Sequence, residues 1–228
     1  LQESYAGKER RTPAGVDARE SRMTTTFDAK LNREISKVFA ANPDLPDHRS
    51  VHPWLTGALG VPESGIVFLA ENPSLSMVER ATNPGGGAPT EEAQWYASKG
   101  DRLFREALVI AGFKSGSWDS LGGWRCYITN VIKQADYAEA WKRRGQSARH
   151  EAAEIWSPIL KWQLEQVAPR LVVTMGNQVD GLVKTLAKKK LISLPPVHRI
   201  DHYSYVALRP RGKLGPMHPE RVAAYRQD

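Results

Sequence analysis

The chain has 228 residues, of which 41% are hydrophobic and 25% are charged, a composition typical of a globular protein with one sizeable core. No run approaches the roughly 18 consecutive apolar residues of a membrane span, and the first residues include no apolar signal-peptide segment. We therefore predict a cytoplasmic protein with no membrane partner. The single cysteine, Cys126, excludes an internal disulfide and leaves no Cys/His spacing for zinc or an iron–sulfur cluster, so we predict no metal site.

The positive charge of the chain is concentrated near its C-terminal end. Residues 184–228 contain ten Lys and Arg against three acidic residues, which equals the net charge of +7 of the whole chain. A local surplus of this kind indicates a polyanionic partner, with nucleic acid as the first candidate. A solubilising surface is the alternative interpretation.

The first residues differ from the rest of the chain. Residues 1–28 are polar and aperiodic, with too few apolar groups to offset the entropy of ordering them, and we predict a flexible polar tail. Residues 29–228 are predicted to form a single domain. Its first helix is expected over residues 29–41, where Leu31, Ile35 and Val38 share one face, and it ends before the Asn42-Pro43 turn.

Short apolar runs then alternate with segments of helical period. The predicted strands are 66–70, 126–132, 171–175 and 203–208, and the predicted helices lie near 101–111, 148–167 and 178–189. This alternation predicts an α/β fold, a three-layer α/β/α sandwich around a central, mainly parallel four-stranded sheet. Ligands bind such sheets beyond the carboxyl ends of the strands. The expected ligand-binding segments are 71–74, 130–134, 176–178 and 209–221.

A nucleotide cofactor finds no support in the sequence. The Gly/Pro-rich segment 82–89 predicts a loop, but no Gly-Lys-Ser/Thr follows it, so it is not a phosphate-binding P-loop. GxGxxG does not occur at any strand-to-helix turn either. We therefore predict no cofactor.

Several short motifs are ordinary turns when each is taken alone, but their order along the chain is informative. The stretch "AENPSLS" follows the strand 66–70, an aromatic pair lies at Trp95-Tyr96, "YITNVIK" spans residues 127–133, "TMGN" closes the strand 171–175, and "MHPERV" lies at 217–222. In this order the motifs resemble the uracil-DNA glycosylase superfamily over residues 60–228. Asn72-Pro73 is similar to the Asn-Pro-Gly of the mismatch-specific thymine/uracil branch. Glu71 and "YITNVIK" are similar to motifs of the iron–sulfur branch.

The resemblance implies a DNA glycosylase that flips a pyrimidine nucleotide out of DNA and hydrolyses its N-glycosidic bond, and we expect it to act as a monomer. Asn72 would position the water and His218 would donate a hydrogen bond to O2 of the leaving base, while the neighbouring Glu71 could supply a base. Asn130 would read the pyrimidine edge. Trp95 or Tyr96 would stack on the flipped base, and Ser74 and Ala70 would line the pocket that holds it. The residues expected to contact DNA are Arg221, Val222, Lys213, Arg211, Lys133 and Asn177.

Three departures from the family pattern shape the expected substrate. The cluster-binding cysteines of the iron–sulfur branch are absent, and His218-Pro219-Glu220 stands where the family has His-Pro-Ser. Ser74 replaces a tyrosine that, in the uracil-specific branch, blocks 5-substituted pyrimidines. Two substrates therefore remain open: uracil from deaminated cytosine, in repair, and a 5-substituted pyrimidine of phage DNA, in defence. A non-catalytic nucleic-acid binder on the same scaffold is the alternative function, and a nucleotide- or phosphate-handling α/β enzyme is a third.

Overall fold

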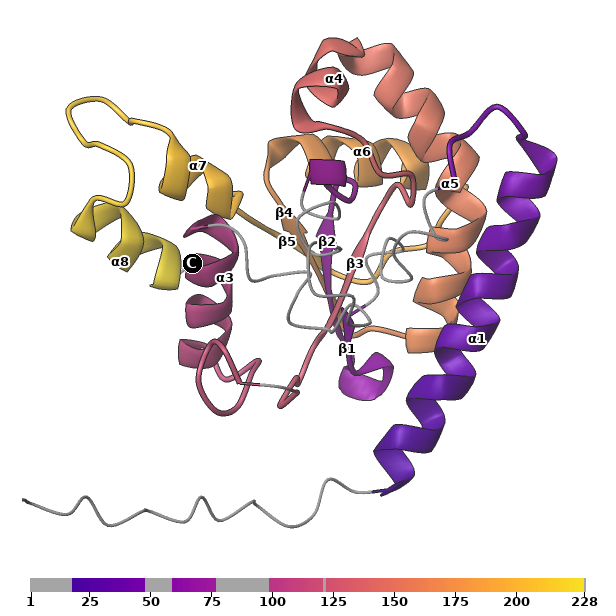
Figure 1. The fold of residues 1–228 in the computed structure, drawn as a ribbon, viewed down its shortest axis with the longest axis horizontal. Helices are drawn as coiled ribbons and strands as arrows, with labels where there is room; N and C mark the ends of the chain where they lie inside the picture. Colours follow the sequence, from indigo (N-terminus) through magenta and orange to yellow (C-terminus); the bar gives the residue numbers. More distant parts are fainter. Residues whose placement is uncertain (1–17, 48–58, 77–98, 121, 228) are drawn as a thin grey trace, which may run out of the picture.

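The computed structural model describes residues 18–47, 59–76, 99–120 and 122–227, with the side chains of 18–26 excepted (Figure 1). Its single sheet has the strand order β1-β3-β2-β4-β5, in which only β1 runs antiparallel to its neighbour. The strands are β1 (Leu59–Gly60), β2 (Ile66–Ala70), β3 (Tyr127–Asn130), β4 (Leu171–Met175) and β5 (Val197–Ile200). The helices are α1 (Ala18–Ala41), the short 3-10 helix η2 (Pro62–Ser64), α3 (Lys99–Ile110), α4 (Ala138–Arg143), α5 (Gly145–Val167), α6 (Asn177–Lys188), α7 (Tyr203–Leu208) and α8 (Pro219–Gln227).

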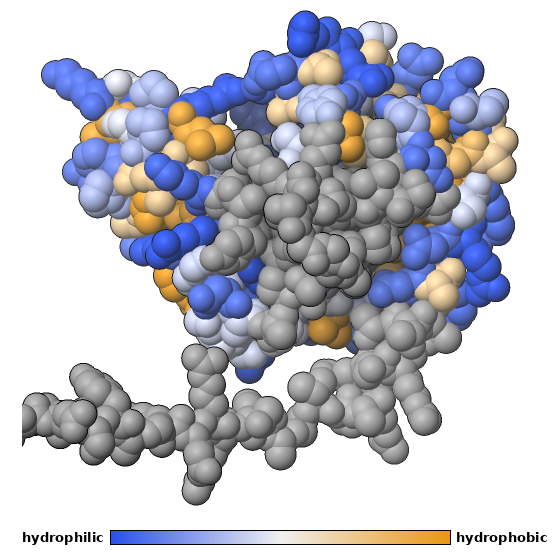
Figure 2. All heavy atoms as spheres, viewed as in Figure 1, coloured by the Kyte–Doolittle hydropathy of each residue, from blue (hydrophilic) through white to orange (hydrophobic). Residues whose placement is uncertain are grey.

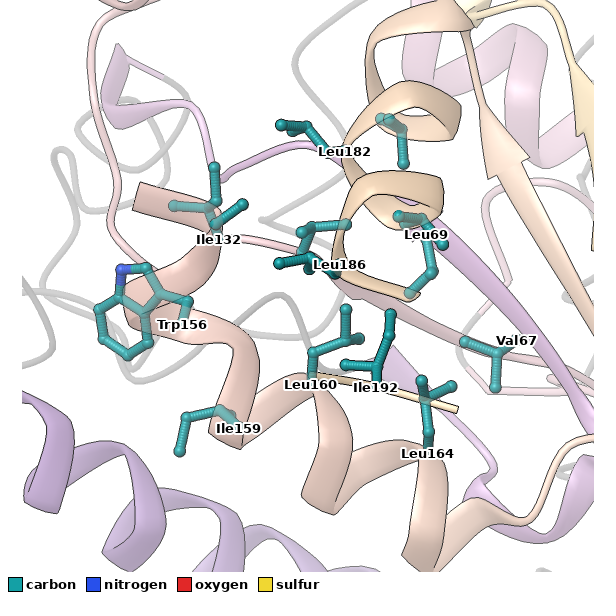
Figure 3. Close-up of a cluster of buried hydrophobic side chains, with 14 of the residues drawn as sticks. Val67, Leu69, Ile132, Trp156, Ile159, Leu160, Leu164, Leu182, Leu186 and Ile192 are labelled. Atoms are coloured by element: carbon teal, nitrogen blue, oxygen red, sulfur yellow. The ribbon is translucent and has the colours of Figure 1, made fainter. Parts of the chain in front are cut away.

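Helices cover both faces of the sheet because successive strand residues point to opposite sides. Val67 and Leu69 of β2 pack into one core cluster, while Phe68 between them packs into another. The first cluster lies under α1, α5 and α6, and Figure 3 shows Leu160 and Leu182 directed into it. The second cluster joins the opposite face to α3, α7 and α8. The predicted three-layer α/β sandwich is confirmed.

Two strands differ from the prediction. Residues 203–208 form the helix α7 instead of a strand, with Val206 and Ala207 buried, and the last strand is Val197–Ile200. In β5 only Ile200 is buried, so this edge strand lacks the apolar run that marks β2 and β4. The two-residue β1 adds a fifth strand that is too short to leave a sequence pattern.

The helix α1 is longer than expected. It begins at Ala18, so the last part of the predicted tail, 1–28, is helical, and residues 1–17 lie outside the described residues. Phe27 accounts for this extension because its ring packs 5.6 Å from that of Tyr127 and 5.2 Å from that of Trp162, centroid to centroid. Burial beside this contact raises the pKa of Asp28 to about 6. Within the described ranges, no helix combines the length and the apolar character needed to cross a membrane.

Candidate active site

A cleft of about 1160 Å³ opens at the carboxyl edge of the sheet, and residues of α4 and α7 line it. Because β2, β3, β4 and β5 are parallel, the segments that follow them meet at this edge. The lining residues include Ala70 to Ser74 at the end of β2, Asn130 of β3, Gly176 to Val179 after β4, and Asp201 to Tyr205 after β5. The cleft thus occupies the position that the fold predicts for a ligand.

The floor of the cleft is held by backbone hydrogen bonds that continue the sheet beyond its strands. After β2 and β3 end, the backbone N–H of Ile132 donates to the carbonyl of Glu71 over 2.9 Å. Farther along, the N–H of Asp136 donates to Pro73 O over 3.2 Å, and the N–H of Leu75 donates to Asp136 O over 2.9 Å. The loop after β2 is therefore fixed by the segment after β3, independently of the side chains that it presents to the cleft.

Two amide side chains from separate sequence motifs lie in this cleft. Asn72 is half-buried, and its Nδ2 donates to Pro73 O over 3.3 Å. Asn130 is 8% exposed, and it stands opposite Ala70 in the parallel pairing of β3 with β2. Both residues line the cleft. Amides offer a donor and an acceptor together, which suits the orientation of a water molecule or the recognition of a base edge.

Glu71 is held against the wall of the cleft by α4 and α5. Its Oε1 accepts a hydrogen bond from Trp141 Nε1 over 2.7 Å and lies 3.4 Å from Nη1 of Arg149. Burial raises the pKa of this carboxyl group above its ordinary value, and the bond from Trp141 and the charge of Arg149 oppose that rise. The carboxylate is thus positioned by two side chains and has a greater affinity for protons than an exposed glutamate.

His202 follows directly after the last strand and lines the cleft. Its Nδ1 accepts a hydrogen bond from the backbone N–H of Ser204 over 3.2 Å and lies 2.7 Å from Ser204 Oγ. Burial, aided by the charge of Arg209, lowers its pKa to about 4, so the imidazole is neutral near neutral pH. Since a backbone N–H can only donate, Nδ1 is the unprotonated nitrogen, and Nε2 carries the hydrogen.

Gly176 permits His202 to lie this close to the end of β4. The glycine has a φ of +91°, and an added Cβ would approach the Cβ of His202 to 3.1 Å. A left-handed φ is unfavourable for residues with a side chain, and the short approach would require His202 to shift by a few tenths of an ångström. The glycine therefore brings the segments after β4 and β5 together at the cleft.

A comparison with known protein families agrees with this geometry. The sequence model described as the uracil DNA glycosylase superfamily matches residues 58–227, which include every residue of the cleft. The chain belongs to the uracil-DNA glycosylase superfamily. Membership suggests DNA glycosylase activity and DNA as the substrate. No curated protein matches the chain.

Residues of the motifs that follow β2, β3 and β4 line the cleft, and the two histidines of interest differ in their position. His218 is not among the cleft-lining residues of the described chain, whereas His202 is. His202-Tyr203-Ser204 matches the first and third residues of the family's His-Pro-Ser motif. The sequence interpretation took the histidine from "MHPERV" and placed a strand at residues 203–208, so it gave His202 no role.

Two cations predicted to contact DNA are buried. Lys133 is 3% exposed; its Nζ donates to Thr129 Oγ1 over 2.8 Å and to the carbonyl of Asn130. Burial lowers the pKa of Lys133 well below its ordinary value. Arg221 is 7% exposed, and its guanidinium donates to three carbonyl oxygens of the chain. The structure thus places both side chains inside the protein, each hydrogen-bonded to the chain itself.

The other predicted residues divide between the cleft and its surroundings. Ser74 and Ala70 line the cleft, and Ser74 Oγ lies 3.1 Å from Ser76 Oγ. Val222, predicted to contact DNA, is partly buried against the second core cluster. The remaining placements are these: Asn177 and Arg211 line the cleft, Lys213 is exposed outside it, and Trp95 and Tyr96 lie outside the described residues.

The sequence interpretation also missed parts of the cleft wall. Trp141 and Arg149 left no signal because they contact Glu71 from far along the chain. Arg199 of β5 also lines the cleft, and its Nη1 donates to Asn177 Oδ1 over 2.6 Å. In the described part of the chain, no three His, Cys, Asp or Glu side chains gather as a metal site would require. Cys126 is fully buried, and burial raises its pKa to about 12.

Proposed function

We propose that this protein is a DNA glycosylase that hydrolyses the N-glycosidic bond of a uracil or 5-substituted pyrimidine nucleotide flipped into the cleft. The observation that carries the proposal is that Asn72, Asn130 and His202, which follow or end three different parallel strands, line a single cleft in a chain of this superfamily. The reaction needs a water molecule placed under C1′ of the sugar, and it needs donors for the negative charge that develops on the departing base.

Asn72 and Glu71 are assigned to the water. The Asn72 amide orients the water by hydrogen bonding but cannot take its proton near neutral pH. Glu71, the adjacent residue of the cleft floor, is a carboxylate whose raised pKa makes it a stronger base than an exposed glutamate. We therefore assign Glu71 the role of the general base that accepts the proton of the attacking water.

His202, in place of His218, is assigned to the leaving base. Its hydrogen on Nε2 can donate to O2 of the pyrimidine, while the Ser204 N–H holds the ring through Nδ1. A neutral imidazole with a pKa of about 4 remains a donor across the neutral range. A donor aimed at a developing anion in a water-poor site strengthens as the charge forms, which accelerates bond cleavage.

Asn130 and Ser74 are assigned to base selection. The Asn130 amide pairs its donor and acceptor with the edge of the pyrimidine. Ser74 and Ser76 are small side chains at the same floor, so they leave room for a substituent at C5. A preference for uracil supports a repair role, and a preference for a bulky 5-substituent supports defence against phage with modified DNA.

The test is base release from a panel of oligonucleotides that contain uracil or one 5-substituted pyrimidine each, scored as abasic sites. Removal of one donor to a developing anion costs about a hundredfold or more in rate, and we expect this loss for His202→Ala and for Asn72→Ala. His218→Ala is the matched control and should retain most of the rate. Release from no substrate of the panel would refute the proposal, and DNA binding without release would instead support the non-catalytic binder.

A further inference from the structure

The exposed apolar side chains of the described residues are unevenly distributed. Large exposed ones are Ile110, Tyr137, Tyr205, Leu208 and Met217. Tyr205 and Leu208 line the cleft, and Tyr137 lies between two lining residues, Asp136 and Ala138. The tyrosines are 45% exposed at 137 and 41% at 205. An exposed aromatic ring in the cleft and a second one next to its lining residues are an arrangement that a solvated surface alone does not require.

Each tyrosine is presented on a fixed piece of backbone. The N–H of Tyr137 donates to Asp136 Oδ1 over 2.8 Å, and its carbonyl accepts from the N–H of Trp141 over 2.9 Å. The N–H of Tyr205 donates to His202 O over 2.8 Å, and its carbonyl accepts from Arg221 Nη2 over 2.6 Å. The backbone under each ring is therefore held by hydrogen bonds, so it loses little ordering entropy when a ligand stacks on the ring.

The two sides of the cleft are formed by α4 and α7. Trp141 and Lys142 of α4 line it, and so do Tyr205 and Leu208 of α7. A ligand at the mouth of the cleft can therefore contact both helices.

Positive charges accompany both tyrosines. Lys142 and Arg143 follow Tyr137 along α4, and the Lys142 side chain is 50% exposed. Beyond Tyr205, Arg209, Arg211 and Lys213 are all exposed. In Figure 2 the region of α7 and α8 shows hydrophobic and hydrophilic residues side by side. Cations interleaved with exposed aromatic rings are the arrangement by which proteins bind unpaired nucleic acid.

We propose that the mouth of the cleft is a track for single-stranded DNA, in which Tyr137 and Tyr205 stack on bases that flank the target nucleotide. In a duplex the base faces cover one another, so surface rings cannot reach them, whereas the bases of a single strand are free to stack on aromatic side chains. The cations beside each ring contact the flanking phosphates. This inference rests on the proposed function for the identity of the target base, but the strand preference is a property of binding alone.

The first test measures binding of a fluorescent oligonucleotide without a target base, single-stranded and then as a duplex of the same sequence, by anisotropy at fixed salt. The single strand should bind more tightly. Tyr137→Ala and Tyr205→Ala should each weaken single-strand binding about fivefold or more, as loss of one stacked base does elsewhere. Ile110→Ala is the matched control, because Ile110 is 61% exposed at the end of α3 remote from the cleft residue Asp101.

Two results would overturn the inference: a duplex that binds the unmodified protein more tightly than the single strand, or a Tyr137→Ala/Tyr205→Ala double variant that binds the single strand like the parent. Tyr137→Phe and Tyr205→Phe retain the ring and should keep the parent affinity; a loss equal to that of alanine would also contradict stacking. Base release is assayed separately on both forms of DNA. Absence of release from every substrate would refute the proposed activity without changing the measured strand preference.

Discussion

Replacement of Arg221 by alanine should destabilise the C-terminal part of the domain. The Arg221 guanidinium donates to Tyr205 O over 2.6 Å, to Gly215 O over 2.9 Å and to the carbonyl of Arg209. A hydrogen bond from a charged donor contributes about 1.5–3 kcal/mol each. The carbonyls of Arg209 and Gly215 lie on a surface loop and can bind water instead, so we expect a net loss of about 3 kcal/mol in the free energy of unfolding.

Urea denaturation monitored by circular dichroism measures this loss in the free energy of unfolding. Limited trypsin digestion shows which segment of the chain opens. Opening of the loop should expose cleavage sites after Arg209, Arg211 and Lys213. Arg226→Ala is the matched control. Its partner Glu106 lies 2.6 Å away, but the Arg226 side chain is 36% exposed, so the change should cost about 0–1 kcal/mol.

Arg221→Lys distinguishes an anchoring role, in which the guanidinium holds three carbonyls of the chain, from a DNA-binding role. The lysine keeps the positive charge but lacks the forked guanidinium. We expect it to lose stability much as alanine does. A loss below about 1 kcal/mol for alanine, together with unchanged trypsin cleavage, would refute the anchoring role. If DNA affinity fell while stability stayed constant, the phosphate contact predicted from the sequence would be correct instead.

Three further predictions concern the cleft and its supports. If Glu71 is the base, the rate of base release should fall as the pH drops through its raised pKa, and Trp141→Phe should move this fall to higher pH because the carboxylate loses a donor; an unmoved profile would contradict the assignment. Lys133→Met should remove a rise in the free energy of unfolding as the pH approaches the ordinary lysine pKa of about 10.4 from below, since the unfolded chain binds a proton there that the buried amine does not; an equal slope by urea titration in both proteins would exclude it. Gly176→Ala should cost about 1–2 kcal/mol through its left-handed φ and should slow base release by displacing His202, and a variant with the parent rate would show that this contact is dispensable.

The sheet was predictable where its strands are buried on both faces. Ile66–Ala70 is a continuous apolar run, and Thr174 alone interrupts that of Leu171–Met175, as expected for central strands covered by helices. The edge strand Val197–Ile200 buries only its last residue, so its sequence resembles a loop. The sequence interpretation assigned the histidine role to His218, whereas the histidine that lines the cleft in the described chain is His202, just after this strand.

The buried cations could not be identified from the sequence. Lys and Arg are residue types that usually lie at the surface. The main partners of Lys133 and Arg221 are backbone carbonyl oxygens, which every residue carries. Whether a carbonyl lies within reach depends on the folded path of the chain and not on residue type. Asn72 and Asn130 were predictable by contrast, because each stands at the end of a strand whose apolar pattern is clear.

The backbone pairing under the cleft separates stability from base selectivity. Since main-chain atoms of Pro73, Leu75 and Asp136 hold the floor, the side chains of Ser74 and Ser76 carry little of its free energy of folding. Substitution at these two positions can therefore change the shape offered to a base at small cost to the fold. Ser74 is therefore a suitable position for redesign. A larger side chain there would be expected to narrow the range of bases that the cleft accepts.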